Sequence, residues 1–139
     1  MGNYSSFDIS ASGLIAQRVR MDAIANNIAN AETTRTPQGG PYRRQQTVFS
    51  LPLQTAGGPN AVNLMGPTPS VEEDDAPPKL VYDPGHPDAD AKGYVALPNV
   101  NVVEEMVDMV SATRAYESNI AAITAAKTMA QAALEIGKG

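Results

Sequence analysis

The sequence predicts a mainly α protein in which long N- and C-terminal helices pair as a coiled-coil-like hairpin, with a Pro/Gly-rich middle that contains short β-strands. The first observation is that all 11 prolines lie between Pro37 and Pro98. Helix interiors exclude proline because it lacks a backbone donor and clashes with the preceding turn. The second is that apolar residues recur at spacings of three and four in both proline-free ends, which is typical of helices that pair along a seam. We therefore expect one helix in residues 1–34, an irregular insert with strands in residues 35–98, and the other helix in residues 99–139.

The N-terminal helix is predicted from about Ser5 to Asn30. Ser5 and Asp8 resemble a capping box at its start. Gly13 is a weak point, which costs up to ~1 kcal/mol relative to alanine. The apolar stripe of this helix is interrupted by Gln17 and consists of Leu14, Met21, Ile24, Ile28 and Ala31.

The C-terminal helix is predicted from Asn101 to Gly137. Asn101 is a capping residue, and Glu104 three residues later completes a capping box. Val103 and Val110 widen its stripe. The stripe alternates between spacings of three and four, and consists of Met106, Met109, Thr113, Tyr116, Ile120, Ile123, Lys127, Ala130 and Leu134.

These stripes predict the helix-pairing and subunit contacts of the chain. The residues proposed for them are Leu14, Met21, Ile24 and Ile28 on the first helix, and Met106, Met109, Val110, Tyr116, Ile120, Ile123 and Leu134 on the second. The chain has no Trp and only two Phe, so the middle offers few large side chains to cover the stripes. Two helices bury only one stripe apiece, and the apolar surface left over marks an interaction site. Neighbouring copies or homologues are the natural partners.

Asn26, Asn27 and Asn30 stand out within the first helix, because asparagine is a poor helix former. One interpretation makes Asn30 a C-terminal cap and leaves the other two in solvent. The other places amide side chains between packed helices, where they both donate and accept hydrogen bonds and set the register or the subunit contacts. The residues alone leave both interpretations open.

In the middle segment, strands are expected at residues 42–49, 79–82 and 93–97. The acidic run at residues 72–75 is expected to be a solvated face or a mobile loop.

The segment 83–90 contains the only histidine, His86, and three carboxylates. This composition fits a metal site or an acid/base cluster, but also a proline-stiffened loop whose Asp side chains cap turns. No second His and no Cys is present to hold a transition metal, and neither a Gly-x-Ser-x-Gly elbow nor a phosphate-binding glycine motif occurs. We therefore favour the turn-capping loop, and expect no catalytic residue, no metal site and no cofactor.

Composition narrows the classes of partner. The net charge is −5 and the pI about 4.7, which argues against nucleic-acid binding because such proteins neutralise phosphates with clustered Lys and Arg. The absence of Cys excludes disulfides. No run of about 18 apolar residues occurs, so stable membrane insertion is not expected. No cleavable secretory signal is recognisable, so export would follow a route that reads no such signal.

Five motifs in the chain carry a family resemblance. They are ANNIAN at residues 25–30 followed by Thr33 and Thr34, TPQGGPYRR at 36–44, DPGHPDAD at 83–90, PNVNVVEEMVDM at 98–109 and RAYESN at 114–119. With them the chain resembles the bacterial flagellar basal-body rod protein family, and is most similar to its proximal-rod members. Residues 51–70 fit the resemblance least.

The resemblance implies a non-catalytic structural subunit of the flagellar basal body, in the periplasmic rod. Its terminal helices would form an inner coiled-coil domain stacked around the export channel, and its middle would face outward. The implied partners are other copies of the chain, homologous rod proteins and, in transit, the flagellar type III export apparatus. Such subunits are exported without a cleaved signal and pass motor torque onward. The alternative is a non-enzymatic helical adaptor or export chaperone that binds one partner.

Overall fold

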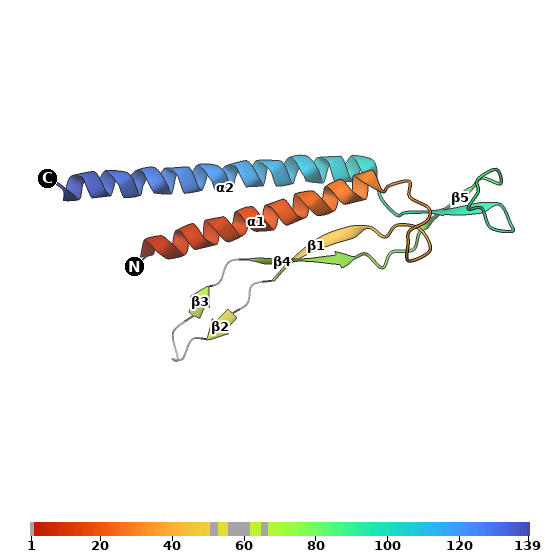
Figure 1. Ribbon diagram of the computed structural model, residues 1–139, viewed down its shortest axis with the longest axis horizontal. Helices are drawn as coiled ribbons and strands as arrows, with labels where there is room; N and C mark the ends of the chain where they lie inside the picture. Colours follow the sequence, from red (N-terminus) through yellow and green to blue (C-terminus); the bar gives the residue numbers. More distant parts are fainter. Residues whose placement is uncertain (1, 51–52, 56–61, 65–66) are drawn as a thin grey trace.

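Two long antiparallel helices dominate the structure. The computed structural model describes residues 2–50, 53–55, 62–64 and 67–139. Helix α1 spans Gly2–Ala29 and helix α2 spans Val102–Gly137. They lie side by side, with both chain ends at the same end of the pair (Figure 1). The predicted helical hairpin is therefore confirmed, whereas its supercoiling stays a prediction.

The predicted start of α2 is confirmed, but the predicted start of α1 is not. Helix α1 begins at Gly2, so the predicted start at Ser5 is wrong; no proline precedes Ser5, and the helix continues through it. Helix α2 begins as predicted, because the Asn101 side chain accepts a hydrogen bond from the Val103 N–H at 3.2 Å. This bond satisfies one of the backbone donors left free at a helix start.

The middle of the chain forms three two-stranded antiparallel ribbons within the described residues. Strand β1 (Gln45–Ser50) pairs with β4 (Thr68–Glu73), β2 (Leu53–Thr55) with β3 (Val62–Leu64), and β5 (Lys79–Tyr82) with β6 (Tyr94–Leu97). The predicted strands at 79–82 and 93–97 are confirmed, and the one predicted at 42–49 begins three residues later.

Strand β4 was not expected from the sequence. Glu72 and Glu73 pair with Gln46 and Gln45 of β1, so they do not lie in a loop. Their side chains are exposed, which fits the predicted solvated face. Pro69 also lies in β4, opposite Phe49. A two-stranded ribbon accommodates both features, because each of its strands is an edge strand where proline and charge are tolerated.

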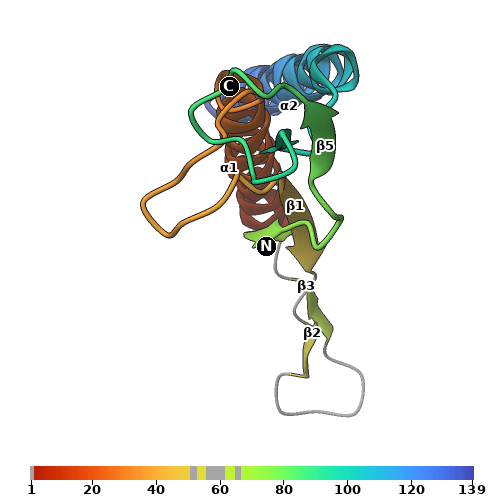
Figure 2. The ribbon, with the colours of Figure 1, turned by 90° about the vertical axis from the view of Figure 1, so that its right-hand side faces the viewer.

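Helix α1 is the element around which the others pack. It contacts α2 along one face and the β1–β4 ribbon along another. Figure 2 shows the helices nearly end-on, with the ribbon beside α1. The β5–β6 hairpin instead extends away from the helices, at the end opposite the termini (Figure 1). The chain is therefore an elongated molecule with one helical layer and a ribbon along part of it.

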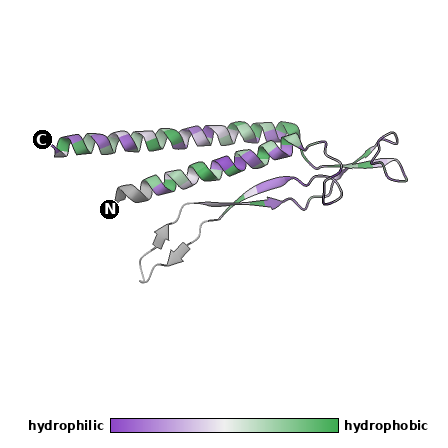
Figure 3. Cartoon of the chain, in the orientation of Figure 1, coloured by the Kyte–Doolittle hydropathy of each residue, from purple (hydrophilic) through white to green (hydrophobic). Residues whose placement is uncertain are grey.

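The buried apolar core is small. Among the described side chains it consists of Ala16, Ala23, Ile24, Val95 and Ala112. Figure 3 shows apolar residues along the whole of α2, interspersed with polar ones. Neither helix contains a stretch long and apolar enough to cross a lipid bilayer.

The cap at Asn101 yields a first prediction. Asn101→Ala should lower the free energy of unfolding by about 1 kcal/mol, because an orphan N–H at the start of α2 loses its acceptor. Urea denaturation of the purified chain measures the change. Asn99→Ala, which alters an exposed residue outside the helix, is the matched control. Equal losses in the two variants would show that the cap contributes nothing.

Candidate assembly interface

The face that α1 turns toward α2 is defined by three contacts spaced seven residues apart. Asn27 Nδ2 donates to Glu105 Oε2 at 3.1 Å, and Arg20 pairs with Asp108 at 3.4 Å. At Gly13, a Cβ atom would lie 3.2 Å from Asn119 Nδ2. The glycine that the sequence marks as a weak point thus lies where the helices approach too closely for a larger residue to fit without displacement.

Residues of the predicted seam on α1 are at least half-buried. Ile24 is buried, and it lines a concavity together with Thr47 of β1 and Asp108 of α2. Leu14, Met21 and Ile28 are half-buried. They follow Gly13, Arg20 and Asn27 by one residue, which is about 100° around the helix. They therefore flank the face that meets α2.

The predicted seam residues of α2 fall into a half-buried group and an exposed group. Met109, Tyr116 and Ile123 are half-buried. The exposed fractions of the other four members are high, and the structure does not bring these side chains to α1: Met106 53%, Val110 56%, Ile120 43% and Leu134 69%. As subunit contacts these four stay a prediction.

The positions of α2 that meet α1 are small or polar. Glu105 and Ala112 are buried, and Asn119 lies against Gly13. Each precedes by one residue a position of the predicted stripe, namely Met106, Thr113 and Ile120. A search for large apolar side chains therefore selects the neighbouring stripe. The stripe that meets α1 instead consists of the small Ala112 and the polar Glu105 and Asn119.

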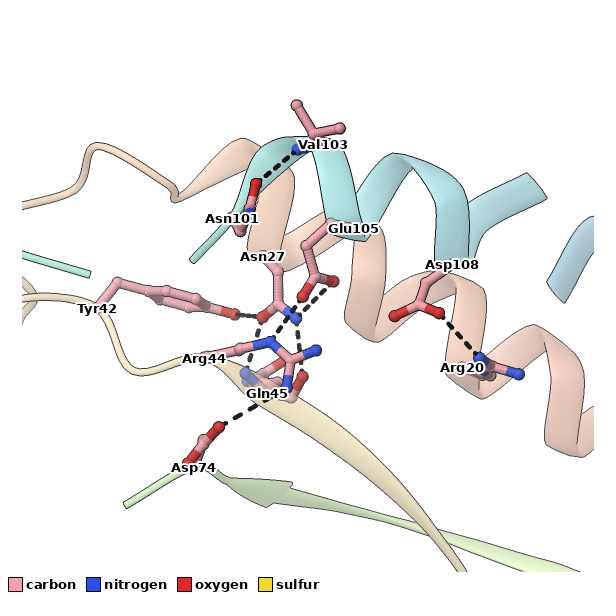
Figure 4. A network of polar contacts seen from close by, with 10 residues as sticks. All are labelled: Arg20, Asn27, Tyr42, Arg44, Gln45, Asp74, Asn101, Val103, Glu105 and Asp108. Carbon is pink, nitrogen blue, oxygen red and sulfur yellow. Dashed lines mark hydrogen bonds and ion pairs between the residues drawn. The ribbon is translucent and has the colours of Figure 1, made fainter. Parts of the chain in front are cut away.

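Asn27 is the best-satisfied polar group of this interface. Its side chain is 1% exposed. Besides the bond to Glu105, Nδ2 donates to the Gln45 carbonyl at 2.8 Å, while Oδ1 accepts from the Gln45 N–H at 2.7 Å and from the Tyr42 hydroxyl at 3.0 Å. These four bonds use the full capacity of an amide side chain (Figure 4). Asn27 thus joins α1, α2 and the start of β1.

Glu105 is a buried carboxylate in the first turn of α2, also 1% exposed. Arg44 Nε donates to its Oε1 at 2.6 Å, and Asn27 supplies the bond to the other oxygen. Arg44 also lies 3.7 Å from an oxygen of Asp74, just past β4 (Figure 4). The positive end of the α2 dipole further favours the negative charge. We call Asn27, Tyr42, Arg44, Gln45 and Glu105 the polar junction.

Two groups of the polar junction have shifted pKa values. Burial lowers the pKa of Arg44, but the hydrogen bond and charge of Glu105, with Asp74, outweigh it, so the net pKa is raised. Burial raises the pKa of the Tyr42 hydroxyl, and the negative charges of Glu105 and Glu73 raise it further. Both shifts favour the states seen here, a charged guanidinium and a neutral phenol that donates to Asn27.

The segment between α1 and β1, residues 30–44, is here called the strap. It turns sharply at Thr36–Gly40, where the Thr36 N–H donates to the Gly40 carbonyl at 2.9 Å. Gly39 and Gly40 have φ values of 88° and 80°, a region that favours glycine. A further bond from the Tyr42 N–H to the Thr33 carbonyl closes the turn. The strap thereby returns Tyr42 and Arg44 to the end of α1.

The three asparagines of the ANNIAN motif have different roles. Only Asn27 bridges elements from a buried position. Asn26 is exposed, and the Asn30 side chain donates to the Asn26 carbonyl at 2.9 Å, at the end of α1. The capping interpretation therefore fits Asn30, and the cross-helix interpretation fits Asn27.

The 83–90 loop is organised by turn-capping bonds. Asp83 accepts from the Gly85 N–H at 3.2 Å, and Asp90 accepts from the N–H groups of Lys92 and Tyr94 at 2.8 and 2.9 Å. Asp88 accepts from the Thr34 hydroxyl at 2.8 Å, which ties the loop to the strap. This geometry fits the turn-capping interpretation of its Asp residues.

The sequence patterns do not single out Glu105, Arg44, Tyr42 and Gln45 as functional residues. A usable signal was present at Glu105. It precedes Ala112 and Asn119 by multiples of seven residues, on a stripe of small and polar side chains. No local pattern marked Arg44, because its partner lies 61 residues away along the chain.

Comparison with known proteins gives a consistent result. A family model described as "Flagella basal body rod protein" matches residues 7–35, and one described as "Flagellar basal body rod FlgEFG protein C-terminal" matches residues 91–136. The chain is 49% identical to the flagellar basal-body rod protein FlgC of Borreliella burgdorferi over the full length of both. The chain belongs to the FlgC family of flagellar basal-body rod proteins. Its resemblance to the rod family is thereby confirmed.

Other FlgC relatives support the assignment. The Bacillus subtilis protein is 46% identical over 99% of this chain and all of its own length, and the Salmonella typhimurium protein 45% identical over 95% and 96%. The two family-model matches include most of α1 and nearly all of α2, and they contain Asn27 and Glu105 respectively. The FlgC family is a structural one, not an enzyme family.

The polar junction yields a second prediction. Asn27→Ala should lower the free energy of unfolding by at least about 2 kcal/mol, because it leaves buried groups of Glu105, Tyr42 and Gln45 without partners. Asn26→Ala, one residue away and exposed, should change it by less than about 0.5 kcal/mol. Chemical denaturation of both variants measures the difference. Similar values would contradict the central role assigned to Asn27.

Proposed function

We propose that this FlgC-family chain is a structural subunit of the proximal rod, which assembles through its terminal helices around the export channel and transmits motor torque. The observation that supports this most strongly is the surface that a single chain leaves uncovered. Its accessible surface is 9975 Å². A compact monomer of 14.6 kDa would expose about 6,900 Å², so this chain exposes about 3,000 Å² more.

Such an excess corresponds to several protein–protein interfaces, since a standard interface covers about 800 Å² per partner. The exposed surface of α2 also contains large apolar side chains, which favour contacts with other proteins. Val103, Met106, Val107 and Val110 are all exposed at the start of α2, on the side away from Glu105. Ile120, Met129 and Leu134 extend the exposed apolar surface along the helix. Exposed apolar side chains in this number favour association with copies or homologous rod proteins.

The shape supports an inner and an outer part for the assembled subunit. The helices form one long layer, and the β5–β6 hairpin projects beyond it with Leu80 and Tyr82 exposed (Figure 1). In the proposed arrangement, the helices line the rod interior and the middle segment meets outer neighbours. A chain held by so small a core also suits passage in unfolded form through the flagellar type III export apparatus, without a cleaved signal, to the periplasmic rod.

The non-catalytic role belongs to the same proposal. The 83–90 loop uses its Asp side chains in turn-capping and ion-pair contacts, which supports a structural part for it. An adaptor or chaperone that binds one partner remains the second candidate, because a long exposed helix face also suits a fixed complex. Sedimentation with homologous rod proteins separates the two: growth into polymers supports the rod subunit, and a discrete one-to-one complex supports the adaptor.

Ile120 provides the test of assembly. Because its side chain is exposed in the single chain, Ile120→Asp should leave expression and the free energy of unfolding nearly unchanged while abolishing rod assembly and swimming. Motility in soft agar and basal bodies counted by electron microscopy measure the effect. Ser118→Asp, which places the same charge at an exposed polar position two residues away, should remain motile. A motile Ile120→Asp strain would contradict the proposed contact.

A further inference from the structure

Burial is unevenly distributed along the two helices. Among the side chains described for the two helices, residues 7–29 of α1 and 102–137 of α2, the buried ones all lie between residues 16 and 27 and between residues 105 and 112. Residues 7–15 and 113–137 contain none. The polar contacts between the helices, Asn27 with Glu105 and Arg20 with Asp108, lie in the same proximal halves. The fully buried contacts between the helices therefore lie near the strap, whereas from the Gly13–Asn119 contact toward the termini the described side chains are half-buried or exposed.

The proximal contact is also incomplete without the strap. Glu105 is buried and needs a cation, and Arg44 of the strap is its ion-pair partner. Asn27 needs the Tyr42 hydroxyl and the Gln45 backbone to satisfy its amide. If α2 met α1 while the strap was unfolded, it would bury a carboxylate without its cation, which is strongly destabilising.

The strap is in turn held by the middle of the chain. The Asp74 N–H donates to the Arg44 carbonyl at 2.8 Å, next to the first β1–β4 pair, and the Asp74 carboxylate faces the Arg44 guanidinium. Closer to α1 in the strap, the Thr34 hydroxyl donates a hydrogen bond to Asp88 of the 83–90 loop. The strap thus connects the folded middle with the helix pair.

We propose that the polar junction is a folding lock, which permits α2 to pair with α1 only once the strap has folded onto the end of α1. The proximal halves then become ordered together with the middle segment in the single chain. The distal halves depend on neighbours for their order, a part of the inference that rests on the proposed function.

The test is amide hydrogen exchange on the purified chain at high dilution, which requires no rod. In the wild type, amides of residues 17–29 and 105–112 should exchange at least about ten-fold more slowly than those of residues 119–137. Arg44→Gln should remove that protection from both helices, although residue 44 lies in neither. The control is Arg43→Gln. Among the residues that the structure describes, Arg43 pairs only with the fully exposed Asp75, so its loss should change exchange less than about two-fold.

A double variant keeps the test decisive if Arg44→Gln does not fold. Arg44→Met combined with Glu105→Leu removes both charges of the buried pair, so no fully buried carboxylate is left without its cation, and such replacements are often neutral or stabilising. The half-buried Asp74 loses its ion pair and Asn27 Nδ2 loses one acceptor, which accounts for the tolerance set below. Protection of the proximal halves should return to within about three-fold of wild type. Exchange as fast as in Arg44→Gln would overturn the proposal, as would equal exchange of proximal and distal halves in the wild type. A failed Ile120→Asp experiment would leave this lock intact and reject only the assembly contact.

Discussion

The burial of the Glu105 carboxylate is the constraint on which the arrangement of this chain depends. A charge with 1% exposure must be matched by a cation and by hydrogen-bond donors. Here the cation comes from the strap and the donor from the end of α1, and the helix start adds its own positive potential. Because three segments far apart in sequence must meet at one carboxylate, the antiparallel register of the helices and the return of the strap follow from it.

This constraint explains how a chain with so few buried apolar side chains keeps a defined shape. Three of the five buried apolar side chains in the described part of the chain are alanines, which contribute little area. Hydrogen bonds and ion pairs are directional, so they fix how the helices are oriented where apolar burial contributes little. The large apolar side chains of α2 therefore stay available for contacts with other subunits. This use of polar contacts within the chain and apolar side chains for neighbours suits a member of the FlgC family, whose surfaces must serve both kinds of contact.

Much of the fold could be predicted from the sequence, since helices and turns are largely determined by local residues. The confinement of proline to residues 37–98 located both helices, and the Asn101 cap followed from its residue type. The contact face of α2 could not be found in this way. The stripe of Met106 and Ile120 has larger apolar residues than the stripe of Glu105, Ala112 and Asn119. Which one meets α1 is decided by a partner 61 residues distant, Arg44, and by the space that Gly13 leaves for the Asn119 side chain. The spacing of large apolar residues alone does not reveal such a long-range choice.

The contact between Gly13 and Asn119 has a consequence for how members of this family can diverge. Asn119 Nδ2 would lie 3.2 Å from any Cβ placed at position 13, so the two positions share one small volume. Side-chain bulk gained on one helix must be given up on the other, or the helices are wedged apart. Substitutions at these two sites should therefore be tolerated as compensating pairs rather than singly.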